Sequence, residues 1–121
     1  MKMKLLACTV FLAVIVIQSC DNNSLPEPPP VVEGCPDVIS FESEIKPIIN
    51  SSCATPGCHN GDNGPDRNWT VFSNVQGKRL SIKDRINRPP GTPGHMPAVG
   101  SLTADQIETI TCWVDQGGLN N

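Results

Sequence analysis

The sequence contains no tyrosine and few aromatic residues of any kind. Its 121 residues include three phenylalanines and two tryptophans, and four of these lie beyond residue 34: Phe41, Trp69, Phe72 and Trp113. A short chain with so few large apolar side chains buries only a thin core, and such domains usually depend on a disulfide, a metal or a cofactor. We therefore expect something besides side-chain packing to complete the folded part of this protein.

The residue patterns of several enzyme classes are also missing. The sequence shows no Ser-His-Asp set, no pair of carboxylates typical of acid–base catalysis and no phosphate-binding loop. It shows no internal repeat and no sign of a second folded domain, and its formal net charge is −3. We expect neither an enzymatic activity of its own nor a nucleic-acid partner.

The long apolar run of this sequence lies at its N-terminus. Leu5–Ile17 follows two lysines and has the length of a signal-peptide core, which is too short to span a bilayer comfortably. It leads into Ile17-Gln18-Ser19-Cys20, which resembles a bacterial lipobox. We predict a lipoprotein signal peptide over residues 1–19 and lipidation of Cys20, which would anchor the protein to a membrane. An ordinary secretory signal is the alternative.

The segment after the signal peptide has little to bury. Residues 20–34 include four prolines among Asn, Ser and Glu: Pro26, Pro28, Pro29 and Pro30. This composition predicts a semi-extended spacer that is stiffened by polyproline conformation. We therefore expect one folded domain over residues 35–121. The spacer would hold it off a bacterial membrane on the extracytoplasmic side, in the periplasm or at the cell surface.

Cysteine placement gives the clearest indication of chemistry. Four of the six cysteines lie in the expected domain: Cys35, Cys53, Cys58 and Cys112. An exported protein meets an oxidising compartment, so these four are not free structural thiols by default. His59 directly follows Cys58, and four residues separate Cys53 from Cys58. Covalent haem attachment needs such a set, because two thiols form thioethers with the vinyl groups and the imidazole ligates the iron. The common spacing between the cysteines is two residues.

From Ser40 onward the chain resembles the single-haem class I cytochrome c domains found on many bacterial lipoproteins and redox enzymes. The likeness includes an aliphatic helix before the C-x4-C-H motif, Gly64-Pro65 after it, His95-Met96-Pro97 in a Pro/Gly-rich loop, and a closing helix. The apolar residues of the first helix are Phe41, Ile45, Ile48 and Ile49. The resemblance implies an all-α fold, with a few short helices and long loops wrapped around one covalent haem c. It also implies electron transfer with redox partner proteins, alone or within a larger complex.

The same resemblance assigns residues to the haem iron. Carried over to this chain, the proximal axial ligand is His59 and the distal ligand is Met96, which is the usual pair in cytochromes c. His95 is the competing distal ligand. The carbonyl of Pro65 would accept the other N–H of His59 and so fix the orientation of the imidazole. We expect a cavity between these ligands and the two haem-binding cysteines.

The closing helix can be placed from its own residues. Thr103 followed by Gln106 forms a capping box, and Gly117-Gly118 supplies a stop. Ile107, Ile110 and Val114 form the apolar stripe of this helix, and Cys112 lies about 140° around the helix from Ile107, at about 100° per residue. It should therefore face outward, where the arm bearing Cys35 crosses the helix. We predict a Cys35–Cys112 disulfide that compensates for the thin core.

The roles of the cations and the tryptophans stay open. Residues 78–88 carry five cations and one acid, Asp84; the cations are Lys78, Arg79, Lys83, Arg85 and Arg88. They form either a solvated face or a set that meets the haem propionates and docks a partner. We expect Trp69 and Trp113 to pack against the haem.

Two other functions remain possible on the sequence. A zinc or iron site would use Cys53, Cys58, His59 and His95, although a neighbouring cysteine and histidine do not easily reach one tetrahedral ion. A disulfide-stapled binding module without cofactor would pair Cys53 with Cys58 as well as Cys35 with Cys112. A visible spectrum separates these functions, because only the covalent haem gives sharp bands that survive extraction.

Overall fold

The computed structural model describes residues 31–35 and 37–121, so the signal peptide, Cys20 and most of the linker lie outside it. The described chain is helical and contains no strand, which confirms the all-α class. Its elements in chain order are a π-helical turn η1 (Phe41–Ile45), α1 (Lys46–Ser52), a 3₁₀ turn η2 (Pro65–Arg67), α2 (Phe72–Ile86) and α3 (Ala104–Asp115). None of these helices is long and apolar enough to cross a membrane.

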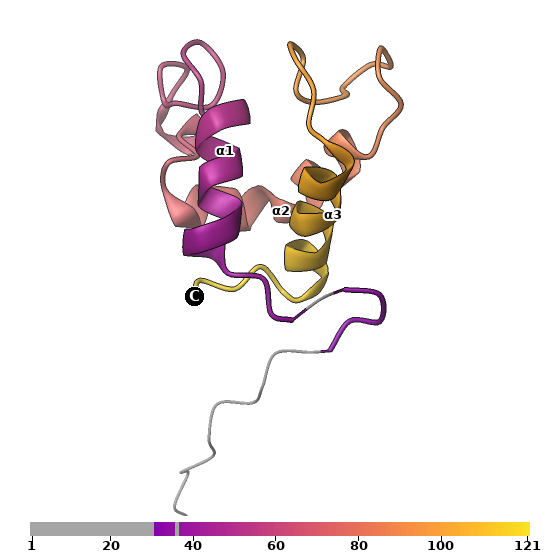
Figure 1. Ribbon diagram of the computed structural model, residues 1–121. Helices are drawn as coiled ribbons and strands as arrows, with labels where there is room; N and C mark the ends of the chain where they lie inside the picture. Colours follow the sequence, from indigo (N-terminus) through magenta and orange to yellow (C-terminus); the bar gives the residue numbers. More distant parts are fainter. Residues whose placement is uncertain (1–30, 36) are drawn as a thin grey trace, which may run out of the picture.

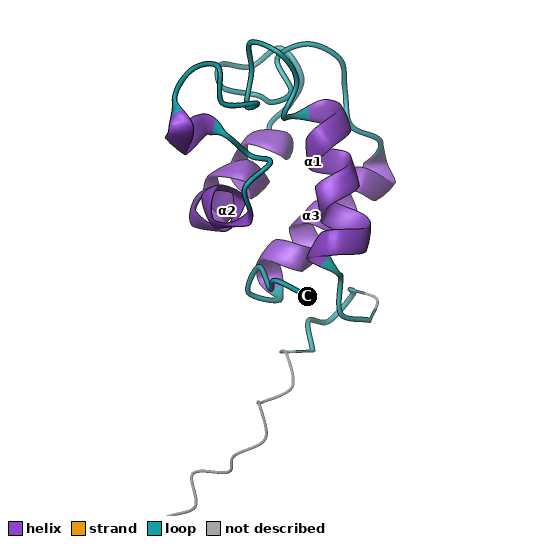
Figure 2. Cartoon of the chain, turned by 90° about the vertical axis from the view of Figure 1, so that its left-hand side faces the viewer, coloured by secondary structure: helices purple, strands orange, loops and turns teal. Residues whose placement is uncertain are grey.

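The helices are arranged so that both long loops lie at one end. In Figure 1, α1 and α3 run in roughly opposite directions and α2 crosses behind them. Residues 53–71 and 87–103 connect them at the end far from the C-terminus, and the turned view of Figure 2 agrees. We call these two segments the loop end. The opposite end, formed by Cys35, residues 37–45 and residues 112–121, is called the stapled end.

The first helical segment forms where the aliphatic pattern predicts it. The Ser40 hydroxyl accepts a backbone N–H of the first turn, and the Ser40 N–H donates to the Glu44 carboxylate. This reciprocal pair caps the segment. Phe41, Ile45 and Ile49 recur every four residues, and all three are buried. This apolar stripe supplies one wall of the core.

Helix α2 is the longest element, and the sequence patterns did not predict it. Val75, Ile82 and Ile86 are its buried residues, spaced seven and four apart, which is a helical period. Gly77 and four cations lie between these buried residues, so the apolar periodicity of the segment is weak; the cations are Lys78, Arg79, Lys83 and Arg85. Packing against α3 therefore stabilises this helix more than its own propensity does.

Helix α3 confirms the predicted cap and stop. The Thr103 hydroxyl accepts the Gln106 N–H, and the Gln106 side chain accepts the Thr103 N–H. Beyond Asp115 the chain turns at Gly117 and Gly118, whose φ angles of 99° and 67° suit glycine. The helix thus has fixed boundaries at both ends.

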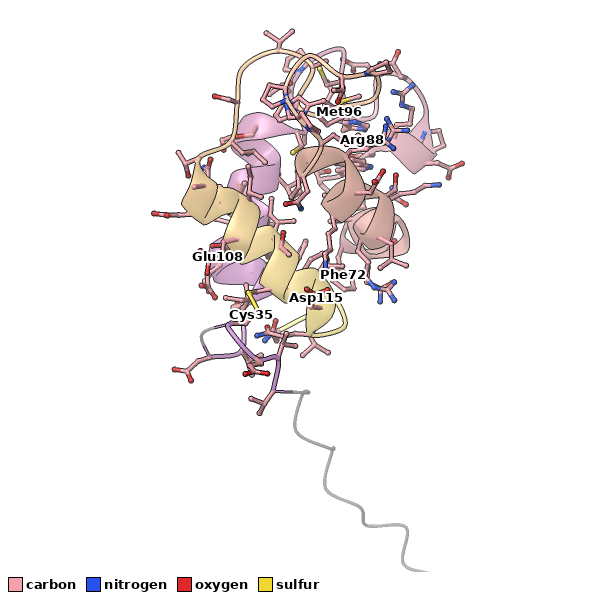
Figure 3. All side chains as sticks on the ribbon, turned by 90° about the vertical axis from the view of Figure 1, so that its right-hand side faces the viewer. Cys35, Phe72, Arg88, Met96, Glu108 and Asp115 are labelled. Carbon is pink, nitrogen blue, oxygen red and sulfur yellow. A yellow bond between two sulfur atoms is a disulfide. The ribbon has the colours of Figure 1, made fainter. Side chains whose placement is uncertain are left out.

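The stapled end is closed by a disulfide and by backbone hydrogen bonds. Cys35 and Cys112 are disulfide-bonded, as predicted. The arm that carries Cys35 lies over Cys112 and leaves it only 4% exposed. Farther along, the Ile39 N–H donates to the Gln116 side chain and the Phe41 N–H donates to the Asn121 side chain. Figure 3 shows the disulfide at Cys35, far from the labelled Met96.

Trp113 belongs to the protein's own core. Its side chain has no exposed surface, and its ring centroid lies 5.6 Å from that of Phe41. The indole N–H donates to the Leu119 carbonyl near the C-terminus. We expected this residue beside a haem, but its packing partners instead belong to the stapled end.

Candidate functional site

The two cysteines of the C-x4-C-H motif lie in the first loop of the loop end. Cys53 follows the last residue of α1, and its N–H donates to the Ile49 carbonyl. The chain then turns through Gly57, whose φ is 76°, and brings Cys58 to the surface. Both thiols are free, whereas the other two described cysteines are paired. The Cys53–Cys58 bridge of the binding-module alternative is therefore not formed.

The two free thiols have different surroundings. Cys53 is 9% exposed and packs with the apolar core, whereas Cys58 is exposed. Burial, and to a smaller extent the neighbouring Cys58, raises the pKa of the Cys53 thiol to about 11. Cys53 is therefore a neutral thiol at physiological pH, and neutral thiols are poor metal ligands and poor nucleophiles.

His59 is held between the cysteines and Trp69. The backbone N–H of His59 donates to the Cys53 carbonyl, and the backbone carbonyl of His59 accepts the backbone N–H of Trp69. The imidazole stacks on the Trp69 indole, with ring centroids 3.6 Å apart and an interplanar angle of 11°. Burial lowers the pKa of His59, and the charges of Arg67 and Arg85 lower it further. The imidazole thus stays neutral at neutral pH, which is the form that ligates metals.

One nitrogen of His59 has no hydrogen bond. Nδ1 is buried and lacks a partner within the described chain. The Pro65 carbonyl, expected to accept from this ring, instead accepts from the Asn68 N–H and from the Asn74 amide. The structure therefore does not show the predicted His59–Pro65 hydrogen bond. A buried polar atom without a hydrogen-bond partner costs free energy, so a bond between His59 Nδ1 and a further group would be favourable.

The second loop of the loop end folds back onto the last turn of α2. The Met96 N–H donates to the Arg85 carbonyl, and the Arg85 guanidinium donates to the Gly94 carbonyl. The Arg88 guanidinium donates to the Pro93 carbonyl. These bonds fix the backbone around Met96 against the end of α2.

His95 also has a fixed orientation. Its Nδ1 lies 2.8 Å from the Arg88 carbonyl. Because a carbonyl only accepts, Nδ1 carries a proton, which leaves Nε2 as the nitrogen that can ligate a metal when the ring is neutral. Met96 and His95 thus both stay candidate distal ligands.

Met96 and His95 line a cavity of about 290 Å³. Its other lining residues are Ile86, Asn87, Arg88, Pro89, Pro90, Ser101, Leu102 and Ile107. We expected a cavity between Met96, His59 and the two cysteines, but Cys53, Cys58 and His59 do not line this one. The difference arises because residues 87–96 fold onto the end of α2 and turn toward the first turn of α3.

Three of the five cations in residues 78–88 make ion pairs or loop contacts. Lys83 pairs with Asp115 of α3, and Arg88 pairs with Asp84. Arg85 donates to the loop that carries Met96, and its charge also reaches His59. Arg85 is thus electrostatically shared by both loops of the loop end, a role that no sequence pattern indicated.

Other known proteins give no guide to this arrangement. Among the described residues, no group of three or more His, Cys, Asp or Glu side chains is placed to hold a metal ion. The zinc-site alternative therefore has no assembled ligand set there. No protein-family model, no characterised protein and no solved structure matches the chain.

Proposed function

We propose that this protein is an extracytoplasmic electron carrier with one covalent c-type haem, anchored to a bacterial membrane through Cys20. One observation carries the proposal: the segment Cys53–His59, with two free thiols and an imidazole, belongs to the loop end, where the loop that carries Met96 also lies (Figure 1). A Cys35–Cys112 disulfide is typical of an exported protein in an oxidising compartment, where two neighbouring free thiols would also tend to pair. Covalent attachment of Cys53 and Cys58 to a haem would explain why these two cysteines do not form a disulfide.

The surroundings of the motif fit a haem better than a bare ion. Cys53 is buried and neutral, and a thioether is also apolar and uncharged. A zinc thiolate at the same position would need a charged sulfur in that apolar environment, which is unfavourable. The neutral imidazole of His59 adds a ligand of the kind that haem iron takes.

Each residue of the site would have a separate task. Cys53 and Cys58 would fix the group covalently, and His59 and Met96 would be the side chains that ligate its iron. When bound, the haem supplies reversible one-electron exchange. The chain keeps the imidazole neutral and holds the Met96 backbone through Arg85. A haem held by both His59 and Met96 would leave a substrate no open position, which is why the proposed activity is electron transfer.

The mass of the purified protein tests this proposal. The full chain is produced in a host that matures c-type cytochromes, and we expect one haem added to the mature polypeptide. Cys53→Ala and Cys58→Ala should each give haem-free protein or a single, weaker thioether. The double variant Cys35→Ala/Cys112→Ala is the matched control, because it removes two cysteines outside the motif and should keep the haem. A wild-type mass equal to bare polypeptide refutes the proposal.

The anchor is tested separately from the haem. Cys20→Ser should release the protein from the membrane fraction and change its processing, while its visible spectrum stays that of the wild type. A wild-type protein found only in soluble fractions would refute the anchor and leave the haem untouched.

The alternative function is a disulfide-stapled binding module without cofactor. The Cys35–Cys112 disulfide and a core that Trp113 fills without exposed surface both favour it. This protein would be colourless after purification, and acid–acetone extraction would remove any adventitious haem. A reduced spectrum whose sharp bands survive that extraction excludes the alternative.

A further inference from the structure

Trp69 is the residue whose ring covers His59. The two rings are nearly parallel, at 11°, and their centroids are 3.6 Å apart. A parallel aromatic contact this close leaves the imidazole little freedom to rotate, because rotation would drive it into the indole face. Trp69 lies ten residues after His59, and no periodic pattern connects them.

The backbone around both residues holds the stack in place. The Trp69 N–H donates to the His59 carbonyl over 2.8 Å, and Asn60 and Asn68 form an antiparallel bridge beside it. The two segments joined by this bridge approach closely, since a Cβ added at Gly61 would lie 3.2 Å from the Asn68 side chain. The Asn68 side chain also accepts the Thr70 hydroxyl and N–H. Hydrogen bonds on both sides of the stack therefore hold the loop that carries His59 and Trp69 in one conformation.

Among the described residues, no hydrogen bond orients the His59 imidazole. A ligating histidine is usually oriented by a hydrogen bond from its second nitrogen to a carbonyl or carboxylate. Here Nδ1 of His59 is buried without a partner, and the Pro65 carbonyl already accepts two other donors. Trp69 is the one ring contact recorded for His59 in the described chain.

We propose that Trp69 is a positioning residue that sets the plane of the His59 imidazole at the iron by stacking, in place of a hydrogen bond to Pro65. The inference rests on the proposed function, because it concerns the ligand of a haem. The stack also keeps water from one face of the ligand. A drier ligand environment favours the less charged ferrous state and so raises the reduction potential.

Electron paramagnetic resonance of the ferric protein tests this role, because its g values depend on the plane of the axial imidazole. We expect Trp69→Leu to keep the covalent haem, to shift or broaden the g values and to lower the reduction potential. Trp69→Phe keeps a flat ring and should restore values near those of the wild type. Phe72→Leu is the matched control: Phe72 is a partly buried aromatic that packs on Phe41, and its loss should leave the g values unchanged.

The outcomes separate this inference from the function on which it rests. A wild-type chain without a haem adduct overturns the proposed function, and the role of Trp69 at the iron is overturned with it. A haem-loaded Trp69→Leu protein with wild-type g values and potential overturns the role of Trp69 alone. Equal shifts in Trp69→Leu and Phe72→Leu also overturn it, because they would show a general loosening of the fold.

Discussion

At the stapled end, Trp113 and Ile45 have no exposed surface and a disulfide ties the N-terminal arm to α3, whereas at the loop end His59 and Met96 are only partly buried and Cys58 is exposed. The stapled end is held by apolar packing, by a covalent bond and by hydrogen bonds from the N-terminal arm to Gln116 and Asn121. The loop end is held by backbone hydrogen bonds and tight turns. Its side chains are sulfur, imidazole and guanidinium groups, and the core depends on few of them.

This difference shows how a thin core supports a site. Because the disulfide and the buried Trp113 lie at the stapled end, the loops can carry chemically active residues in partly exposed positions. The Met96 backbone is fixed through α2, which is itself packed on α3. Changes at the two ends should therefore have separable effects on stability and on chemistry.

The largest expected effect on stability is at Trp113. Trp113→Ala should cost about 5 kcal/mol, since it leaves a cavity in the core and also removes the bond to the Leu119 carbonyl. Trp69→Ala should cost well under half of that, because Trp69 is only partly buried. Chemical denaturation of both variants measures the difference. Equal losses would show that the two ends share one core.

Removal of the staple should have the next largest effect. Cys35 and Cys112 lie 77 residues apart in sequence, so the disulfide strongly restricts the unfolded chain. The double variant Cys35→Ala/Cys112→Ala should lose about 4.5 kcal/mol in the chain-entropy model. The variant Cys53→Ala/Cys58→Ala, compared in haem-free protein, should lose less. If the two double variants lose the same amount, the staple has no special role.

The buried thiol of Cys53 should make the haem-free chain sensitive to alkali. Its pKa is raised from 9.0 to about 11 in the folded state, so between these values the unfolded chain releases a proton that the folded chain retains. Stability contributed by this group is present below pH 9 and is lost as pH rises toward 11, by about 2–3 kcal/mol. Cys53→Ala should abolish this component in pH-dependent denaturation. In the haem-loaded protein the sulfur would be a thioether and would not titrate.

The sequence predicted the stapled end better than the loop end. The stop at Gly117-Gly118 and the Cys35–Cys112 pair, both at the stapled end, follow from local rules or from helical geometry, and the structure confirms both. The Thr103 cap, where the second loop meets α3, is also confirmed. Helix α2 was missed because its buried residues are sparse among cations. In the loop end, the His59–Trp69 stack depends on how an irregular loop closes on itself, which no periodicity encodes.

The smallest effect on stability and the most specific effect on chemistry are expected at Met96. Its backbone is held by the Arg85 carbonyl, and its side chain lines a cavity and is only partly buried, so Met96→Ala should fold with covalent haem retained. A thioether ligand favours ferrous iron. Its loss should therefore lower the reduction potential, remove the weak sulfur-to-iron absorption of the ferric state and open a position that binds carbon monoxide.

His95→Ala is the matched control, since His95 is the neighbouring residue in the same cavity and its ring is bonded to the Arg88 carbonyl. If His95→Ala produces these changes and Met96→Ala does not, the sixth ligand is His95, and the centre is a bis-histidine haem of lower potential.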